Sequence, residues 1–391
     1  MKAIVIGGGI AGPVAAMALQ KSGIESRVFE AYDGTADGVG GALSIAPNGR
    51  TALKAIDAEH VVERIGTPMA GMVMQSWTGK RLGEFGSPAD LPQMLLVWRA
   101  ELYRALYDEA VQRGVAFEHG KRLTQIDGGE ARFADGTTAA ADVIVGADGI
   151  RSTTRRLIDP AAPEPRYAGL LGFGARVTKT DGLDDTHDKM HMVFGKRAFF
   201  GYQVGRDDAG WFANLPHRAP MSAAEARRVD NAEWLRRIAE VFGDDRVPAV
   251  ELIRRTDPDD LVVTGGLEDI PRVPTWHRGN VVLIGDAAHP TSPSSGQGAS
   301  LAIESAVQLA RCLRDLPPER AFQQYERIRR ERVERIIKMA ARTNSDKAAG
   351  PVGRVLRDLL MPTLMRFARP SSFAWQFDHP IDWDERVALP T

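Results

Sequence analysis

Three glycine-rich stretches of this 391-residue chain contain residue types that suit the binding of a large phosphorylated ligand. The first is Gly7-Gly8-Gly9-Ile10-Ala11-Gly12, a GxGxxG that directly follows the apolar run AIVI. In such a loop the first glycine makes a tight turn and the second lets backbone amides approach a pyrophosphate. The third lets helix and strand pack closely, and the helix N-terminus attracts the anion. The pattern predicts a dinucleotide site.

An acidic residue follows at the expected distance. Glu30 stands 18 residues after Gly12, at the end of the next strand-like run, SRVFE. A carboxylate in this position can accept hydrogen bonds from both hydroxyls of an adenosine ribose, and it would repel a 2′-phosphate. The first motif therefore predicts NAD or FAD, and not NADP, as its ligand.

The second stretch, DVIVGADGIRSTTR, also carries a turn directly after an apolar run. Asp148 and Gly149 fit a simple type I′ turn, and they equally fit a turn whose amides approach a dinucleotide. Periodicity does not separate these two interpretations.

The third stretch, GNVVLIGDAAHPTSPSSGQGAS, is an apolar run followed by Asp286, His289 and a second glycine-rich turn. We expect Asp286 to cap the segment that follows it. We also expect a long helix from about residue 298, whose N-terminus would present unpaired amides and a positive dipole end. A ligand that extends beyond its pyrophosphate to an isoalloxazine ring would need such a second element.

The elements that position these stretches alternate between strands and helices at both ends of the chain. Residues 2–30 predict a strand–helix–strand unit with a parallel strand buried on both faces. Residues 38–56 predict a loop that enters a helix, and 71–85 predict a hairpin. From about 160 to 270, short alternating runs interrupted by one helix within 222–243 indicate a mostly antiparallel sheet. The chain should then be helical to about Arg369, with a break near Pro351.

Composition excludes several classes of protein. The formal net charge of -1 gives no electrostatic basis for binding nucleic acid. One cysteine permits no intrachain disulfide. The N-terminal apolar run is too short for a signal peptide, and no apolar run reaches the ~18 residues of a membrane span. We expect a cytoplasmic protein without a membrane span; the oligomeric state is not readable.

Together the three motifs resemble those of the FAD-dependent aromatic hydroxylases, the group A flavoprotein monooxygenases typified by para-hydroxybenzoate hydroxylase. Residues 148–155 fit the family's DGxxSxxR, and residues 285–290 with 296–298 fit its third motif. The motifs span nearly the whole chain. Its short length makes it more similar to the salicylate hydroxylase and tetracycline-modifying branch.

The resemblance implies an α/β fold. It consists of a Rossmann-like FAD-binding domain of the GR2 type, an inserted, mostly antiparallel β-sheet substrate domain and a C-terminal helical segment. We expect the discontinuous FAD-binding domain to comprise residues 1–69, 97–164 and 271–350. The substrate-binding sheet domain should comprise 70–96 and 165–270, and the helical segment and tail 351–391.

The resemblance also implies cofactor-binding roles along the chain. Glu30 should hold the adenosine ribose, and Leu123 should lie where a backbone group meets the adenine. Arg99 should contact the FAD phosphates or ribityl chain. Further residues implied for the cofactor are Gly7, Gly9, Ile10, Ala11, Gly12, Asp148, Gly149, Arg155, Gly285, Asp286, Gly296, Gln297, Gly298 and Ala299.

Within this set, the resemblance gives several residues a specific task. Asp148 and Gly149 belong to a motif implicated in both FAD and NADPH binding, with Arg155 in support. Asp286 should bond the ribityl or pyrophosphate part of FAD, and the amides of residues 296–299 should lie near the N1–C2 edge of the flavin. Ser305 departs from the family's usual Glu-Asp-Ala, which could remove one hydrogen bond.

The activity implied is hydroxylation or epoxidation of an aromatic or polyketide-like small molecule. NADPH or NADH, bound transiently, reduces FAD; dioxygen then gives a C4a-hydroperoxyflavin that transfers one oxygen atom to the substrate. No metal is expected. Two alternatives stay open: a reductase or dehydrogenase on the same fold, and a non-catalytic FAD protein that sequesters a reactive intermediate.

No catalytic residue can be assigned from the sequence, but His191, Tyr202 and Pro290 are candidates for the substrate pocket. Strand alternation sends Phe200 and Tyr202 to one face of their strand and Phe199 to the other. His187 and His191 have the i, i+4 spacing of a metal pair, but they lie in a predicted loop entering a strand, where they would not converge. We expect His289 to be a packing residue.

Overall fold

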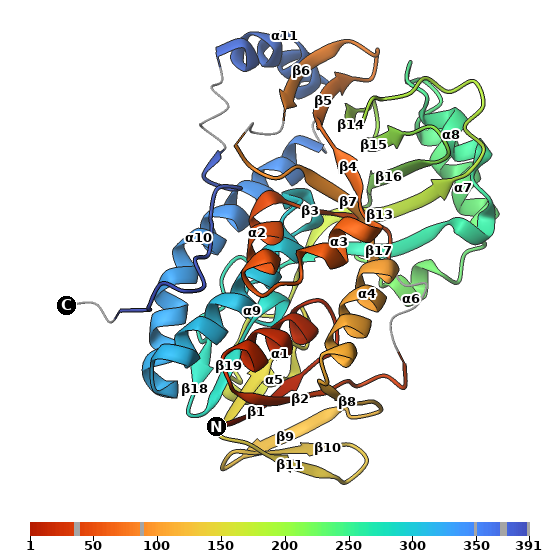
Figure 1. Ribbon diagram of the computed structural model, residues 1–391. Coiled ribbons are helices and arrows are strands. Elements are labelled where there is room, and N and C mark those ends of the chain that lie inside the picture. Colours follow the sequence, from red (N-terminus) through yellow and green to blue (C-terminus); the bar gives the residue numbers. More distant parts are fainter. Residues whose placement is uncertain (35–39, 87–89, 348–349, 368–373, 389–391) are drawn as a thin grey trace.

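The computed structural model describes residues 1–34, 40–86, 90–347, 350–367 and 374–388. A mostly parallel sheet flanked by helices forms one end of the molecule, and a larger sheet forms the other (Figure 1). The long helices α9 (Gly298–Asp315) and α10 (Pro318–Lys347) run beside the first sheet.

The first sheet has the strand order β18-β19-β12-β1-β2-β8. Every pair in it is parallel except β18 and β19. Its central strand, β1, is buried from Ala3 to Ile6, which explains why the sequence there is a continuous apolar run. The strands are β1 (Lys2–Ile6), β2 (Glu25–Phe29), β8 (Ala116–Glu118), β12 (Val143–Gly146), β18 (His277–Arg278) and β19 (Val281–Leu283).

The second sheet has the order β17-β13-β16-β15-β14-β5-β6, and only the pair of β5 and β14 in it is parallel. The predicted hairpin of residues 71–85 is therefore the edge of this sheet, although some 80 residues separate it from the other strands. The strands are β5 (Gly71–Ser76), β6 (Arg81–Gly86), β13 (Arg166–Val177), β14 (Lys189–Phe194), β15 (Phe199–Val204), β16 (Ala209–Pro216) and β17 (Val262–Asp269).

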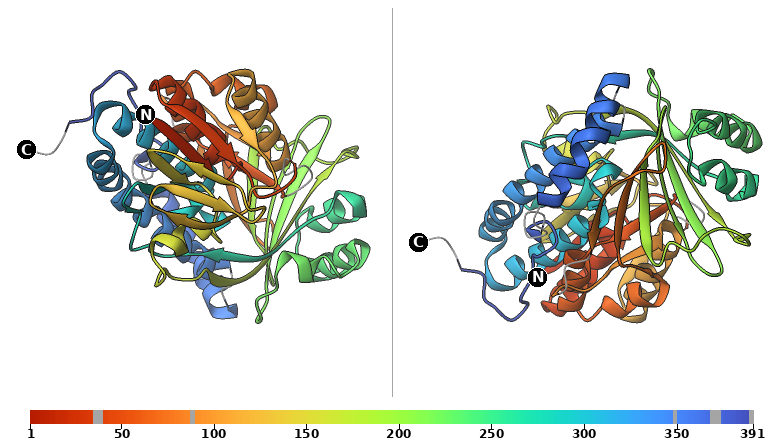
Figure 2. Two further views of the ribbon diagram at one scale, coloured as in Figure 1. Left: turned by 90° about the horizontal axis from the view of Figure 1, so that it is seen from below. Right: turned by 90° about the horizontal axis from the view of Figure 1, so that it is seen from above.

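Helices α7 (Asn231–Val241) and α8 (Ala249–Arg255) pack on one face of the seven-stranded sheet, which we call the outer face (Figure 2). The opposite face, the inner face, is lined by methionine and phenylalanine side chains from β14, β15 and β16. These side chains pack against Ala46, which precedes α2 (Pro47–Ala55), and against Met69 and Met94. The inner face therefore looks toward the FAD-binding motifs.

The remaining elements connect and cover the two sheets. A small sheet, β3-β7-β4, lies between them, and β11-β10-β9 forms a separate one. The bounds are β3 (Ala42–Ile45), β4 (Thr67–Met69), β7 (Met94–Trp98), β9 (Leu123–Asp127), β10 (Glu130–Phe133), β11 (Thr138–Ala140), α1 (Ala11–Lys21), α3 (Glu59–Ile65), α4 (Arg99–Gln112), α5 (Thr153–Ile158), α6 (Ala223–Ala226), α11 (Pro351–Phe367) and the single turns η1 (Pro258–Asp260), η2 (Gly285–Ala287) and η3 (Pro293–Ser295).

The predicted elements are mostly confirmed, with three corrections. Residues 42–45 form strand β3, and not a loop, because they pair with β7. The single helix expected within 222–243 is two helices, since Ser222 and Asp230 each cap a separate start. Helix α8 was not predicted. The predicted helix end near Arg369 lies outside the described residues.

Among the described residues, no helix has the length and apolar character needed to cross a membrane.

A buried ion network joins α9 to α10. Glu304 and Arg329 have fully buried side chains and form a direct ion pair, and Arg332 donates to both carboxylate oxygens at 2.8 and 3.1 Å. Burial alone would raise the pKa of Glu304, but the charge of Arg329 and the hydrogen bond from Arg332 outweigh it and lower the pKa to about 2. Residues 300–313 of α9 are all buried, so this network fixes a helix that has no solvent-exposed side along that stretch.

We predict that Glu304→Gln destabilises the protein by about 3–5 kcal/mol, because it leaves two buried guanidinium groups without their counter-charge. Chemical denaturation at pH 7 measures this change in the free energy of unfolding. Glu331→Gln, at an exposed position of α10, is the matched control and should change it by less than about 0.5 kcal/mol.

The difference in stability between wild type and Glu304→Gln should depend on pH. Because the pKa of Glu304 is depressed from 4.5, its contribution is present at neutral pH and disappears as pH falls toward 2. The difference between wild type and Glu304→Gln should therefore narrow below about pH 4.5. A constant difference across that range would contradict the assignment.

Candidate active site

All the sequence motifs lie at one edge of the first sheet. The strands β19, β12, β1 and β2 are neighbours and parallel, so their carboxyl ends meet at the same edge. Asp286 follows β19, Asp148 follows β12, Gly7 follows β1 and Glu30 follows β2. With strands about 4.8 Å apart, this row spans about 14 Å. Ligands of open α/β sheets bind at this edge.

Close backbone packing explains the glycines of this edge. A Cβ on Gly12 would lie 1.9 Å from the carbonyl oxygen of Gly7, and one on Gly7 would lie 2.5 Å from that of Ala147. Gly285 has φ +55° and fits between Ala11 and Ala302. A Cβ on Gly9, in contrast, would meet nothing within 4 Å. The three motifs therefore contact one another, and the loop is open on the side of Gly9, where an approaching pyrophosphate would lie.

The carboxylate of Glu30 is oriented by backbone amides. Gly8 N donates to its Oε2 at 2.6 Å, and Tyr32 N donates to its Oε1 at 3.0 Å. Lys121 N donates to the carbonyl oxygen of Glu30 at 2.7 Å, which brings the start of β9 and Leu123 to the same side of the loop. Each carboxylate oxygen keeps a lone pair for a further donor, as a ribose hydroxyl requires.

The side chains of Asp148 and Arg155 form hydrogen bonds with other groups of the protein. Ser152 Oγ donates to Asp148 at 2.5 Å, and Thr154 donates to it through N and Oγ1 at 2.9 and 3.0 Å, so the carboxylate fixes the start of α5. Arg155 is 1% exposed and donates to the carbonyl oxygens of Ile150 and, at 3.1 Å, Ala287. Arg155 thus ties the second motif to the third.

Asp286 lies between two guanidinium groups. Burial raises the pKa of Asp286 to about 6, although Arg99 and Arg155 lower it in part. Contrary to expectation, the side chain caps no helix, because the turn η2 begins at Gly285 and has no side-chain cap. Arg99 donates from Nε to Tyr103 Oη at 2.8 Å. Asp286 and Arg99 therefore lie close enough to interact electrostatically beside the glycine loops, where a ligand with hydroxyls and phosphates can use both.

Helix α9 presents its N-terminus to the same edge. Leu301 N donates to Gln297 O at 2.8 Å, so the amides of Gly298, Ala299 and Ser300 have no acceptor within the helix. Gly296 has φ +60°, a left-handed conformation that suits glycine. These amides and the helix dipole can stabilise negative charge on a ring placed against them.

Two buried amide groups next to this N-terminus have spare hydrogen-bonding capacity. Asn48 Nδ2 donates to Gln297 Oε1 at 3.1 Å and to Glu304 Oε1 at 2.5 Å. Asn48 Oδ1 and Gln297 Nε2 are buried and have no hydrogen-bond partner. A buried acceptor and donor of this kind fit a ligand with polar edges, as the flavin ring has. The residues present therefore fit FAD.

His289 is a packing residue, as expected from the sequence. It is 2% exposed, and burial followed by the charge of Arg329 lowers its pKa to about 3. Its Nε2 lies 2.8 Å from Ser305 Oγ, which also accepts from Arg329 Nε at 3.2 Å. Ser305, the residue that departs from the family pattern, therefore forms hydrogen bonds of its own.

The structure places His191 and Tyr202 on the outer face of the large sheet. Tyr202 packs with the core that α7 and α8 cover, and His191 Nδ1 lies 3.0 Å from Tyr202 Oη. Met190 and Met192, which flank His191, point to the inner face. The hypothesis that His191 or Tyr202 lines a pocket at the cofactor is therefore corrected, since the sheet separates them from it.

The remaining candidates are Pro290, for the substrate pocket, and His187, for a metal pair. Pro290 is buried, and its carbonyl oxygen accepts from Ile270 N at 3.2 Å, just after β17. His187 lies in the loop before β14 with φ +52°, as expected for a segment entering a strand. Within the described part of the chain, no group of three His, Cys, Asp or Glu residues could hold a metal ion.

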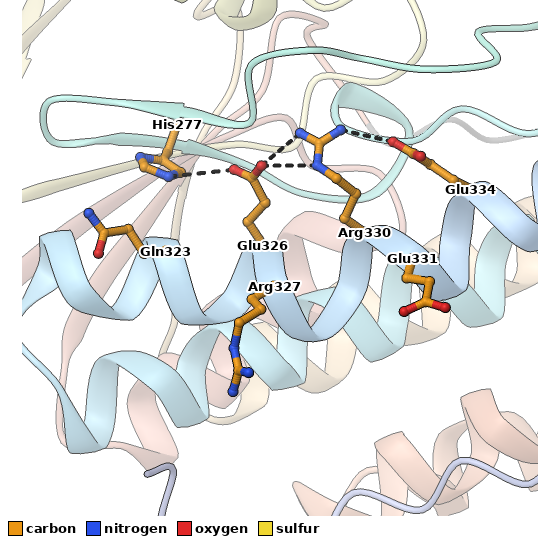
Figure 3. A pocket seen from close by; sticks show the side chains of 7 residues that line it. All are labelled: His277, Gln323, Glu326, Arg327, Arg330, Glu331 and Glu334. Carbon is orange, nitrogen blue, oxygen red and sulfur yellow. Dashed lines mark hydrogen bonds and ion pairs between the residues drawn. The ribbon is translucent and has the colours of Figure 1, made fainter. Parts of the chain in front are cut away.

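A surface groove along α10 contains none of the predicted site residues (Figure 3). His277 lies 3.5 Å from Glu326, and Arg330 pairs with Glu326 and Glu334 at 2.8 and 2.9 Å. Four of the groove's charged or ionisable residues, His277, Glu326, Arg330 and Glu334, are thus paired with one another, which is typical of a solvated helix surface.

Sequence reasoning missed the residues that support the third motif from other elements. Ser44 Oγ donates to Gly296 O at 3.0 Å, and Ala46 N donates to Ser300 Oγ at 2.9 Å. Asn48 and Ser44 belong to no motif and lie about 250 positions from their partners. No local signal in the sequence could have identified them.

An edge of parallel strands that carries three glycine-rich motifs is typical of a dinucleotide-binding fold. The sequence model of the family described as "FAD binding domain" matches residues 1–340. The chain belongs to this family, within the group A flavoprotein monooxygenases. It is an FAD-dependent monooxygenase, so the predicted fold class, enzyme class and cofactor are confirmed, and NAD(P)H is the reductant typical of the family.

Curated relatives and solved structures cover nearly the whole chain. The FAD-dependent urate hydroxylase of Klebsiella pneumoniae subsp. pneumoniae is 33% identical over 367 residues, 90% of this chain and 91% of the relative. The 6-hydroxynicotinate 3-monooxygenase of Pseudomonas fluorescens is 31% identical over 375 residues, 88% of this chain and 92% of the relative. Klebsiella pneumoniae HpxO, crystallised with FAD and uric acid, has a TM-score of 0.82 at 27% identity and covers 95% of this chain and 94% of that chain.

We predict that Asp286→Ala weakens FAD binding about 10–100-fold, the loss expected for one hydrogen bond to a charged group. His289→Ala should change FAD affinity by less than about threefold but lower the melting temperature, because it leaves a buried cavity and removes one hydrogen-bond partner of Ser305. Flavin fluorescence titration of apo-protein and thermal unfolding measure the two effects. Comparable losses of FAD affinity in both variants would contradict the roles given to this loop.

We also predict a pH dependence for the apo-protein. The raised pKa of Asp286 means that the folded state holds this proton more tightly than the unfolded chain does. Relative to Asp286→Asn, wild-type apo-protein should therefore lose stability as pH rises from about 4 to 6, and the loss should persist at pH 7. Thermal unfolding of both proteins across this range tests it; parallel curves would rule the shift out.

Proposed function

We propose that this monooxygenase hydroxylates an electron-rich aromatic or heteroaromatic ring held between the inner face of the large sheet and the loop of residues 285–299. The supporting observation is the apolar cluster in which Met190 and Met192 meet Ala46, whose amide is bonded to Ser300 at the start of α9. This contact puts a methionine- and phenylalanine-lined surface next to the amides predicted for the flavin.

We assign the cofactor-binding roles by the positions of the residues in the row of strand ends. Glu30 would hold the ribose, the open side of Gly9 the pyrophosphate, and Asp286 with Arg99 the ribityl chain and phosphates. Asp148 and Arg155 would act through the loops that they fix. We keep the division into domains at 1–69, 97–164 and 271–350, at 70–96 and 165–270, and at 351–391, and we propose that the protein works in the cytoplasm.

Bound FAD would supply the chemistry, accepting electrons from NADH or NADPH and activating dioxygen. The chain's own contribution would be positional and electrostatic. The amides of Gly298 and Ala299 would stabilise negative charge on the ring system. The apolar inner face would exclude water from the substrate side, where water would otherwise intercept a reactive oxygen species.

The substrate class follows from the relatives. The urate hydroxylase, the 6-hydroxynicotinate monooxygenase and a 3-amino-4-hydroxybenzoate 2-monooxygenase of Streptomyces platensis, 32% identical over 402 residues, all act on nitrogen-bearing or phenolic rings. We therefore propose a small ring that carries hydroxyl or amino substituents.

We predict that at least one ring in a panel of urate, 6-hydroxynicotinate, 3-amino-4-hydroxybenzoate and salicylate accelerates NAD(P)H oxidation by the FAD-loaded protein about tenfold or more. Oxygen from ¹⁸O₂ should appear in the product. Asp286→Ala at the same protein concentration should lose the stimulated rate in proportion to its loss of FAD. Product that carries oxygen only from water would contradict hydroxylation by this route.

A further inference from the structure

Lys347, the last residue of α10, has its amine inside the molecule. The residue is only 9% exposed. Its Nζ donates to Asn214 Oδ1 at 2.7 Å and to Ser294 Oγ at 2.8 Å. Asn214 belongs to β16, and Ser294 belongs to the turn η3 in the loop of residues 285–299. One amine therefore joins α10, the large sheet and the loop that leads to α9, whose first backbone amides we propose to contact the flavin.

The amine lies on the inner face. Along β16, Trp211 and Ala213 pack in the outer core, so the alternating residues Phe212 and Asn214 point inward. Nζ lies 4.3 Å from the ring centre of Phe199 and 5.9 Å from that of Phe212. Phe212 also packs with the methionine cluster of the inner face. Lys347 thus stands at the polar end of an apolar surface, beside the proposed substrate position.

The charge of this amine has no counter-ion among the side chains that the structure describes. Burial alone lowers the pKa of Lys347 to about 7, and no described carboxylate contributes to its shift. Placing an unpaired ammonium in a protein interior is unfavourable, because the charge loses its hydration. The cation–π contacts with Phe199 and Phe212 offset only part of that cost.

The bonds to Asn214 and Ser294 do not explain such a placement, since a neutral amide could donate to both oxygens without that cost. The position is also rigid. Asn344, one turn before Lys347, exchanges hydrogen bonds with Ser292 at 3.0 and 3.1 Å. The amine is therefore held in place, and the group that it lacks is an anion.

We propose that Lys347 determines substrate specificity by binding an anionic oxygen of the aromatic substrate, with Asn214 and Ser294 orienting its Nζ. The anion is a carboxylate or an ionised ring hydroxyl. This inference rests on the proposed function, because it takes the ring to lie on the inner face beside the 285–299 loop. It adds that acidic rings are preferred over neutral rings of the same shape.

The test uses the FAD-loaded protein and measures dissociation constants from the change in flavin absorbance on ligand addition. Each matched pair shares one ring and differs in the charge of one substituent: 6-hydroxynicotinate with 6-hydroxynicotinamide, and salicylate with salicylamide, report a carboxylate. The pair 4-nitrophenol and 4-nitroanisole at pH 8 reports an ionised ring oxygen. Wild type should bind the anion at least about tenfold more tightly in one of these sets.

Lys347→Met should reduce that preference to less than about threefold, with little change for the neutral ring. Lys347→Arg should retain it. Lys338→Met, at an exposed position of the same helix, is the control and should behave as wild type. If Lys347→Met does not fold or hold FAD, Lys347→Gln, which preserves donation to Asn214 and Ser294, replaces it.

A preference for anions that survives in Lys347→Met or Lys347→Gln would overturn the inference, as would equal loss of affinity for both members of every pair. Failure of the proposed function is distinguishable from these results. In that case no ring of the panel would accelerate NAD(P)H oxidation, whatever its charge.

Discussion

The geometry of the site depends on a buried charge, that of Glu304 in α9. Its carboxylate is satisfied from two directions, by Arg329 and Arg332 of α10 and by Asn48 of α2. The carboxylate thereby ties α9 to both α2 and α10, and Ser300 and Ser305 of the same helix add hydrogen bonds with Ala46 and His289. The helix N-terminus that faces the strand ends is therefore positioned by a network about one to two turns further along the helix, and Asn48 carries that restraint directly to Gln297.

In the loops, too, some side chains stabilise the protein itself, whereas other groups remain available for a ligand. The most conspicuous polar residues of the second and third motifs are Asp148, Arg155 and His289. Their side chains form hydrogen bonds with other groups of the protein. The groups left over for a ligand are backbone amides, the side chains of Asp286 and Arg99, and the spare hydrogen-bonding atoms of Glu30, Asn48 and Gln297. A dinucleotide is thus received by a preformed rigid surface, which lowers the entropy that binding must overcome.

The parts of this fold that could be predicted are those encoded locally. Apolar runs followed by glycine turns identified β1, β12 and β19, and the turn chemistry placed all three motifs correctly at strand ends. Strand β3 was missed because its identity comes from pairing with β7. Alternation along β15 correctly separated Phe199 from Tyr202, but it could not tell which face the helices α7 and α8 would cover. Tertiary packing determines which face is covered, and it places His191 on the outer face, away from the cofactor motifs.

The substrate side of the site is the least predictable for a related physical reason. A cofactor shared by a family is bound by contiguous loops, whose backbone geometry constrains the residue types. An occupant of the inner face is contacted by side chains from several elements: Lys347 lies 53 positions from Ser294 and 133 from Asn214. None of these residues needs a special backbone conformation, so nothing local marks them. What distinguishes Lys347 is a buried amine without a counter-ion among the described side chains, a property that exists only once the chain has folded.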